Sequence, residues 1–343
     1  RREVGKMWER EVYEWIPRRE VAAKGGEVLK TRWVQHKKGA LVKCRWVAME
    51  FAKGEPREDL FAGTPPLWAA RLLISKAVSG RRDKTIMALD VSSAFLYADV
   101  LREVFVELPE EDTEGRQRGM VGRLLKALYG TRDAPLAWQE ALTKSLVEWG
   151  FVGSALHPAL FHHPGRDLDV VIHVDDMLCA GTPEDLKWFG EQCSSSYEIT
   201  KEVLEKIGDQ LTYLGRKIRR TEDGFEWEAD HKHLRTLQEE WGMKDCKAAS
   251  TPCEPEDGPK VPILPGHAAA LPPAQMGLEE ARRYRRAAAR LNYLALDRPD
   301  IAVAANKLAR TMARPQVGDE KGVKRVIRYL IGRPRCVWQL PFQ

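Results

Sequence analysis

The chain has 343 residues, 43% hydrophobic and 31% charged, which excludes wholesale disorder and predicts two or three subdomains with substantial cores. Its 55 basic and 50 acidic residues give a net charge of only +5, so local patches must bind any polyanion. The six cysteines lack CxxC spacing, which argues against zinc ribbons and disulfide frameworks and favours an intracellular location over secretion. The apolar runs are shorter than the ~18 residues of a membrane span, so no membrane partner is expected.

The N-terminal part predicts a helix and then a β-hairpin. Residues 7–24 are typical of a helix interrupted at Pro17. Residues 28–54 alternate in polarity around a Lys-Lys-Gly turn, which predicts a hairpin with a basic tip. This tip is either an ordinary solvated turn or a finger that reaches towards phosphate groups, with Lys38 and Arg45 as charge donors.

Two segments place carboxylates at the ends of predicted strands. After a helix at 64–80, the apolar strand 86–91 runs into Asp90 and a series of small residues, whose backbone amides can bind phosphate oxygens. In 169–180 a β-branched run meets Asp175-Asp176 and a second apolar run follows, which predicts a hairpin with an acidic tip. Neighbouring carboxylates repel each other unless a cation lies between them. The pair therefore belongs either to a solvated turn or, together with Asp90, to a metal site.

The remaining elements follow from hydrophobic periodicity. In chain order they are strand 104–108, loop 110–119, a helix from Pro135 to Gly150, helix 183–194, strand 210–220, strand 226–228 and helix 230–242. Trp138 lies on the apolar stripe of its helix, so we expect it in the core. Residues 251–280 contain seven prolines and predict an extended linker.

Two basic amphipathic helices are predicted at 279–296 and 320–332. Charged runs are usually solvated faces. These faces carry almost no interspersed acid, which favours contact with a nucleic-acid backbone.

Several short motifs occur in one order along the chain. They lie at 43–47, 89–96, 128–138, 173–176, 213–215, 245–252, 293–295 and 298–302. In this order, over roughly residues 30–332, they resemble the reverse transcriptases of copia-type LTR retrotransposons. An isolated Asp-Asp pair is weak evidence, whereas this ordered set is specific.

The resemblance implies an α+β fold, a right-hand polymerase with an antiparallel palm sheet, fingers and a helical thumb. It places the N-terminal segment and fingers at 1–84, the palm at 85–215 with an inserted fingers portion at about 98–133, and the thumb or connection at 216–343. The implied activity is RNA-directed DNA polymerisation, in which dNTPs are added to a primer 3′-hydroxyl on an RNA or DNA template. RNase H and integrase segments of the same polyprotein are the further partners implied.

The resemblance also assigns site residues. Asp90, Asp175 and Asp176 match the catalytic triad, which would hold two Mg²⁺ ions, with Mn²⁺ as a substitute. The dNTP would be contacted by Lys38, Arg45, Ser93, Ala94, Phe95, Tyr129 and Gly130. The Phe95 ring would be the steric gate that excludes a ribose 2′-hydroxyl. Leu214 and Gly215 would contact the primer.

Two residues depart from the family pattern. His173 replaces the usual Tyr before Val-Asp-Asp, and Asp133, where relatives often have Gln, is expected to cap the helix at Pro135 and to repel template phosphate. The chain stops at Gln343, where an RNase H domain would begin, so we expect a polymerase core cut from a polyprotein. The alternative is a catalytically inactive, nucleic-acid-binding remnant. A third hypothesis, another palm-based nucleotidyltransferase, is disfavoured by the basic helices and the Leu-Tyr-Gly segment.

Overall fold

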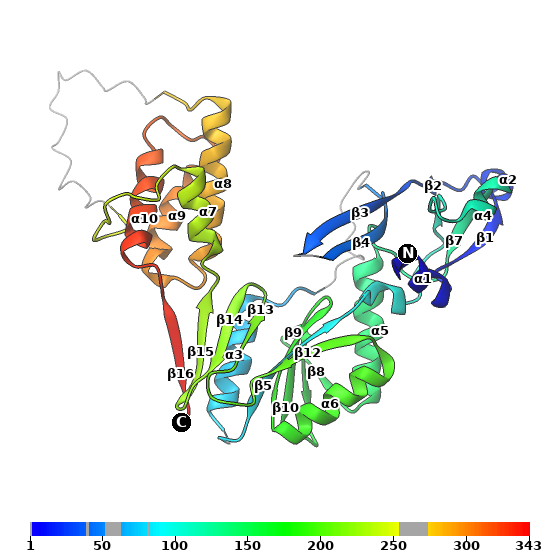
Figure 1. Cartoon of the computed structure of the whole chain (residues 1–343), viewed down its shortest axis with the longest axis horizontal. Helices are drawn as coiled ribbons and strands as arrows, with labels where there is room; N and C mark the ends of the chain where they lie inside the picture. Colours follow the sequence, from blue (N-terminus) through cyan, green and yellow to red (C-terminus); the bar gives the residue numbers. More distant parts are fainter. Residues whose placement is uncertain (1, 39–40, 52–62, 81, 254–273) are drawn as a thin grey trace. The chain divides into compact units, whose positions relative to one another are not determined.

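The chain forms two compact units, described here one at a time (Figure 1). The computed structural model describes residues 2–38, 41–51, 63–80, 82–253 and 274–343. The first unit comprises Arg1–Glu205 with Phe342–Gln343, and the second comprises Lys206–Pro341. The predicted palm limit at residue 215 therefore falls inside the second unit. The finer division into fingers, palm and thumb stays a prediction.

A six-stranded antiparallel sheet forms the centre of the first unit, with strand order β12-β5-β11-β10-β9-β8. The strands are β5 (Thr85–Val91), β8 (Val152–Ser154), β9 (His157–His163), β10 (Leu168–His173), β11 (Asp176–Gly181) and β12 (Ile199–Val203). The predicted hairpin at 169–180 is confirmed as β10 and β11. An antiparallel sheet, as expected for a palm, is confirmed.

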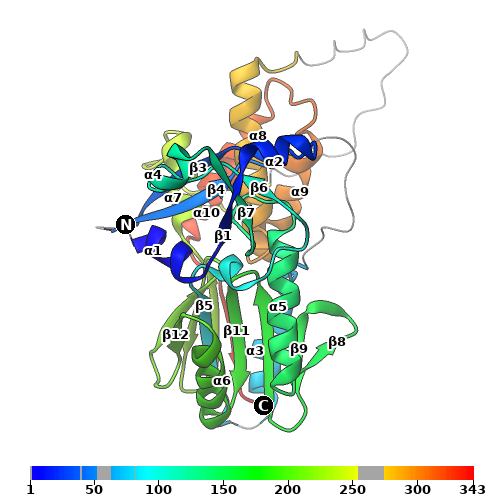
Figure 2. The same cartoon turned by 90° about the vertical axis from the view of Figure 1, so that its right-hand side faces the viewer.

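Three helices cover this sheet: α3 (Leu67–Val78), α5 (Ala134–Glu148) and α6 (Pro183–Ser196). The helices α5 and α6 pack on one face of the sheet, with α3 behind it (Figure 2). Helix α6 begins as its sequence predicts, because the Thr182 hydroxyl accepts a hydrogen bond from the Asp185 amide and Pro183 takes the first position. The core between the sheet and α5 and α6 includes Trp138 and Phe189.

The N-terminal part of the first unit contains a small mixed sheet and a separate hairpin. The sheet order is β1-β7-β6-β2, from strands β1 (Tyr13–Pro17), β2 (Val28–Leu29), β6 (Phe105–Val106) and β7 (Met120–Leu124). The hairpin consists of β3 (Thr31–Lys38) and β4 (Leu41–Ala48), which confirms the hairpin predicted at 28–54. The tip residues 39–40 lie outside the described residues.

Two predictions for this part are wrong. Residues 7–24 do not form one interrupted helix: they contain the end of α1 (Arg2–Glu9), strand β1 and α2 (Arg18–Ala23). Strand β1 forms because β7 supplies an antiparallel partner, from Tyr13 opposite Leu124 onwards, and this long-range pairing overrides local helix propensity. The predicted loop at 110–119 contains helix α4 (Thr113–Gln117), whose first turn is capped by the Asp112 carboxylate.

The second unit combines an antiparallel sheet with a helical bundle. The sheet order is β13-β14-β15-β16, with β13 (Gln210–Tyr213), β14 (Arg216–Arg220), β15 (Gly224–Ala229) and β16 (Val337–Pro341). The main helices are α7 (Lys232–Glu240), α8 (Leu278–Leu294), α9 (Ala302–Arg310) and α10 (Glu320–Gly332), which confirms both predicted basic helices. Most of the predicted Pro-rich linker, 254–273, lies outside the described residues.

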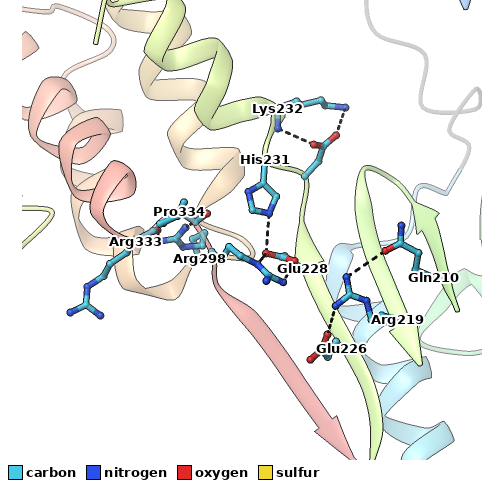
Figure 3. Close-up of polar contacts among 11 residues, drawn as sticks. Gln210, Arg219, Glu226, Glu228, His231, Lys232, Arg298, Arg333 and Pro334 are labelled. Atoms are coloured by element: carbon cyan, nitrogen blue, oxygen red, sulfur yellow. Dashed lines mark hydrogen bonds and ion pairs between the residues drawn. The ribbon is translucent and has the colours of Figure 1, made fainter. Parts of the chain in front are cut away.

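The single strand predicted at 210–220 is wrong, because this segment folds back on itself. Leu214 and Gly215 form a two-residue turn between β13 and β14, with φ values of 46° and 74°. Positive φ at both central residues matches the twist of a tight hairpin. Polar contacts support the sheet beyond this turn: Arg219 donates to Glu226 at 3.2 Å, and His231, the residue before α7, lies 3.0 Å from Glu228 (Figure 3).

Candidate active site

The acidic turn between β10 and β11 is built on a strained residue and a buried tryptophan. Val174 has a φ of 57°, a conformation that β-branched residues rarely adopt. The Trp138 indole donates to the Val174 carbonyl oxygen at 2.6 Å. Trp138 is 1% exposed, so its predicted place in the core is confirmed. The core thus holds the turn that presents Asp175 and Asp176 in one backbone conformation.

The sheet register brings the third carboxylate to the same place. Asp90 lies directly opposite Asp176 on the neighbouring strand, and the Val91 amide donates to the Asp175 carbonyl oxygen at 3.0 Å. All three aspartates are half-buried. Asp90 and Asp175 line an open cleft of about 710 Å³. The structure therefore brings Asp90 beside the adjacent pair Asp175-Asp176, which begins 85 positions later in the sequence.

The donor set suits a hard divalent cation in its chemistry. Mg²⁺ prefers carboxylate oxygens and is usually held by one or two protein carboxylates together with substrate phosphates. Asp90 and Asp176 offer carboxylates from opposite positions of two paired strands, and Asp175 adds a third from the adjoining turn. In the described part of the chain, no three His, Cys, Asp or Glu side chains form a ready-made metal cluster. The residues fit the proposed ion by donor type and backbone position.

The predicted nucleotide contacts surround Tyr129. Its ring centre lies 4.8 Å from that of Phe95, and the Arg45 guanidinium lies 5.2 Å from the Tyr129 ring centre. Burial raises the pKa of the Tyr129 hydroxyl, Arg45 acts in the opposite direction and Asp175 raises it further. The neutral phenol of Tyr129 is therefore favoured, with Arg45 against its ring.

Ser93 and Ala94 follow strand β5 at the start of the 3₁₀ helix η2 (Ala94–Tyr97). Ser93 has a φ of 56°, while Ala94 is buried. Lys38 ends strand β3, and its side chain lies outside the described part of the structure. The structure thus brings Arg45, Phe95 and Tyr129 together. The contact of Lys38 with the nucleotide stays a prediction.

Gly130 joins the β3–β4 hairpin to the residues around the cleft. It has a φ of 88°, and a Cβ atom there would lie 2.0 Å from the Ala48 carbonyl oxygen. The Ala48 amide donates to the Tyr129 carbonyl oxygen at 2.7 Å. Only glycine permits this close approach of two backbones.

Leu214 and Gly215, the predicted primer contacts, lie in the second unit. They form the turn between β13 and β14, and the Leu214 carbonyl oxygen accepts a hydrogen bond from Arg216 Nη1 at 2.7 Å. Their approach to a primer stays a prediction.

Both departures from the family pattern are buried or half-buried. Burial lowers the pKa of His173, against an opposing effect of Asp175, so its neutral form is favoured. His173 Nδ1 is buried without a hydrogen-bond partner within the described residues. The Asp133 carboxylate does not cap helix α5 as predicted: it lies 3.2 Å from Arg102 and is 2% exposed. The Asp133 carboxylate pairs with Arg102 because a buried charge without a partner of opposite sign is unfavourable.

Some basic side chains of α8 and α10 are bonded within their own unit and are not available to phosphate groups as predicted. Arg285 donates to the Met312 carbonyl oxygen and Arg328 to that of Lys247, both at 2.7 Å. Arg290 lies 3.5 Å from Glu240 of α7. Arg290 and Arg328, which lie on the predicted basic faces, therefore stabilise their own unit, as does Arg285 beside them. Nucleic-acid contact by these helices stays a prediction.

One pair at the cleft was not predicted from the sequence. Lys6 of α1 donates to Glu198 at 2.7 Å, and both side chains line the cleft. The two residues are 192 positions apart, and no local pattern links them.

The fold places this chain in a class of protein, the α+β right-hand polymerases. The structure resembles the foamy viral protease–reverse transcriptase solved in complex with double-stranded DNA, with a TM-score of 0.50 and 10% identity. That match covers 95% of this chain and 46% of the other. The expected α+β polymerase fold is therefore confirmed.

The family follows from the sequence comparison. Residues 20–255 match the family described as "Reverse transcriptase (RNA-dependent DNA polymerase)", and the chain belongs to this family. The chain is 28% identical over 274 residues to the retrovirus-related Pol polyprotein from transposon RE1 of Arabidopsis thaliana, which covers 79% of this chain and 18% of the relative. It is 27% identical over 296 residues to the retrovirus-related Pol polyprotein from transposon TNT 1-94 of Nicotiana tabacum. This match covers 82% of the present chain and 21% of the relative. The copia-type resemblance is confirmed.

The chain thus spans about a fifth of these curated relatives. Among the helices in the described ranges, none is long and apolar enough to cross a membrane.

Proposed function

We propose that this chain is an RNA-directed DNA polymerase that adds dNTPs to a primer 3′-hydroxyl. One observation carries the proposal: Asp90 lies opposite Asp176, and the Asp175 backbone is bonded to the same strand, at the edge of a cleft of about 710 Å³. Family membership and the fold support the same conclusion.

In this proposal the aspartates hold the cations of the reaction. Asp90 and Asp175 are the main ligands of two Mg²⁺ ions, for which Mn²⁺ can substitute, and Asp176 supports them. When bound, such ions activate the attacking hydroxyl and stabilise the charge on the leaving pyrophosphate. The Trp138 hydrogen bond to Val174 keeps the acidic turn in place without rearrangement during the reaction.

The residues around Tyr129 bind the incoming dNTP. Arg45, together with Lys38, contributes positive charge for the triphosphate, and Ser93 and Ala94 contribute backbone amides beside it. The Phe95 ring, fixed against Tyr129 at 4.8 Å, takes the place where a ribose 2′-hydroxyl would lie.

Gly130 lets the β3–β4 hairpin approach the backbone beside Tyr129. Leu214 and Gly215 contact the primer.

Template–primer and dNTPs are the partners, and the RNase H and integrase segments of the same polyprotein are further proposed partners. The foamy viral relative was solved with double-stranded DNA, which supports binding of a nucleic-acid duplex.

The test is primer extension on an RNA template with dNTPs and Mg²⁺. The parent chain should extend the primer, and an Asp175→Asn, Asp176→Asn double variant should lose at least about a hundredfold in rate. Asp99→Asn, at a carboxylate whose side chain is 84% exposed, is the matched control and should extend normally. Circular dichroism of each variant establishes that it is folded.

The other outcomes point to the alternatives. Primer–template binding without extension by the parent would support an inactive, nucleic-acid-binding remnant. Nucleotide addition that does not depend on the template would support a different palm-based nucleotidyltransferase.

A further inference from the structure

A second cavity lies in the first unit, lined by residues of α1 and β1 and by residues at the start of α4. Figure 1 shows these elements in the N-terminal part of the unit. Its volume is about 370 Å³, within the range of ligand sites. Three aromatic residues line it, Trp8 of α1 and Tyr13 and Trp15 of β1, together with Glu111 and Glu114. Trp8 and Trp15 are 56% and 41% exposed, so folding leaves much of this aromatic wall open to water.

A buried carboxylate holds two of the rings in fixed orientations. Asp112 is 5% exposed and accepts hydrogen bonds from the Tyr13 hydroxyl at 2.7 Å, the Trp15 indole at 2.8 Å and the Gly115 amide at 3.1 Å. Burial, with the bond to Asp112, raises the pKa of the Tyr13 hydroxyl, which keeps it a donor. Because the rings are already ordered, a ligand meets little of the entropic cost of ordering them.

The charge of the cavity wall favours a positively charged ligand. The Glu111 carboxylate is held by the neutral indole of Trp33 at 3.0 Å. Glu114 lies 2.6 Å from Arg118, whose guanidinium carbon is 5.9 Å from the Trp15 ring centre, so a cation already lies beside this ring. Aromatic faces and carboxylates both attract cations and repel phosphate. Glu111 and Trp33 also line the candidate active-site cleft, whereas the aromatic wall and Glu114 do not. The polymerase function proposed above, which concerns polyanions, gives this aromatic wall no role.

We propose that this cavity binds a positively charged side chain of a protein partner, a guanidinium or alkylammonium group held against Trp8 and Trp15. The open wall lets a long side chain enter while its backbone stays outside, and the carboxylates of Glu111 and Glu114 pair with its charge. The proposal is independent of polymerase activity.

The test uses saturation-transfer NMR on the full chain. The probes are N-acetylarginine amide and N-acetyltrimethyllysine amide. Each is compared with a neutral analogue of similar shape: N-acetylcitrulline amide for the first, and for the second the carbon isostere in which a tert-butyl group replaces the trimethylammonium group. The cationic probes should bind at least about fivefold more tightly than the neutral ones, which corresponds to about 1 kcal/mol of cation–π and charge attraction.

Variants locate the binding. Trp8→Leu and, separately, Glu114→Gln should each weaken binding of the cationic probes about fivefold. Trp68→Leu removes a tryptophan of α3 that is 46% exposed and should leave binding unchanged. Equal binding of the neutral analogues, equal loss in Trp8→Leu and Trp68→Leu, or no binding of either cation would overturn the proposal. Because Glu114 lies on the surface of a short helix, its variant keeps the test decisive if Trp8→Leu fails to fold.

Discussion

Arg216 and Asp297 form a buried ion pair in the second unit: Arg216 Nε donates to Asp297 Oδ2 at 2.9 Å. The other carboxylate oxygen accepts from the Trp227 indole at 2.8 Å. Arg216 also donates to the Leu214 carbonyl oxygen at 2.7 Å. The pair therefore anchors the turn at Leu214, a non-glycine residue at positive φ, to the residues that follow α8.

Removing this carboxylate should destabilise the second unit strongly. Asp297→Ala leaves the Arg216 charge buried without its partner, so the free energy of unfolding should fall by about 3–5 kcal/mol. Urea denaturation measures this change. Glu279→Gln breaks an exposed pair with Arg282 at 2.7 Å and should change stability by no more than about 0.5 kcal/mol. If the two variants lost equal amounts of unfolding free energy, the buried pair of Arg216 and Asp297 would not be a major source of stability.

Substituting alanine at two glycines with positive φ should distinguish the cost of backbone strain from the cost of steric overlap. Gly119→Ala, at a φ of 69° with no atom within 4 Å of the new Cβ, should lower the free energy of unfolding by about 1 kcal/mol. Gly130→Ala forces its Cβ against the Ala48 carbonyl and disrupts the bond from Ala48 to Tyr129, so the loss should reach about 3 kcal/mol or more. Urea denaturation compares them, and similar losses would contradict the backbone contact.

The Trp138 indole should matter for activity as well as for stability. Trp138→Phe keeps an aromatic ring but removes the donor to Val174, which should lower stability by about 1–3 kcal/mol and slow primer extension about ten- to a hundredfold. Trp149→Phe changes the residue that follows the same helix and packs edge-on against Phe189, so it should leave extension unchanged. Equal rates in the two variants would rule out a role for this bond in holding the acidic turn.

Phe95 should decide between deoxyribose and ribose. Phe95→Ala opens space beside Tyr129, so incorporation of rNTPs relative to dNTPs should rise about tenfold or more. Phe95→Leu keeps most of the bulk and should retain the preference. Single-nucleotide extension with each substrate gives the ratio, and an unchanged ratio in Phe95→Ala would remove Phe95 as the steric gate.

Glu228 should make folding sensitive to acid. The Arg335 hydrogen bond lowers the pKa of Glu228 below its ordinary value of 4.5, although burial opposes this. The stabilisation is complete above pH 4.5 and is lost as the pH falls through the lower pKa of the folded state. Thermal unfolding of the parent should therefore show a decline in this acid range that is smaller in Glu228→Gln.

The reciprocal change tests the cause. Arg335→Gln removes the partner that lies 2.7 Å from Glu228, so its acid dependence should resemble that of Glu228→Gln. A full decline in Arg335→Gln would assign the effect to another carboxylate.

The sequence determined most elements of this protein. The β10–β11 hairpin, the β3–β4 hairpin and helix α5 were predicted because side-chain periodicity records which face of an element is buried. The ordered motifs also identified the family, and they predicted that the three aspartates form the metal site, since these residues lie within short, recognisable segments.

Tertiary structure alone decided where distant segments meet. Strand β1 exists because β7 pairs with it, and the turn at Leu214 became visible only once β14 folded back on β13. Asp133 bonds to Arg102 rather than to its own helix, and Asp112 fixes rings nearly a hundred positions away. Local patterns record burial but not partners: a strand needs an edge to bond, and a buried carboxylate takes whichever donor the fold brings near it.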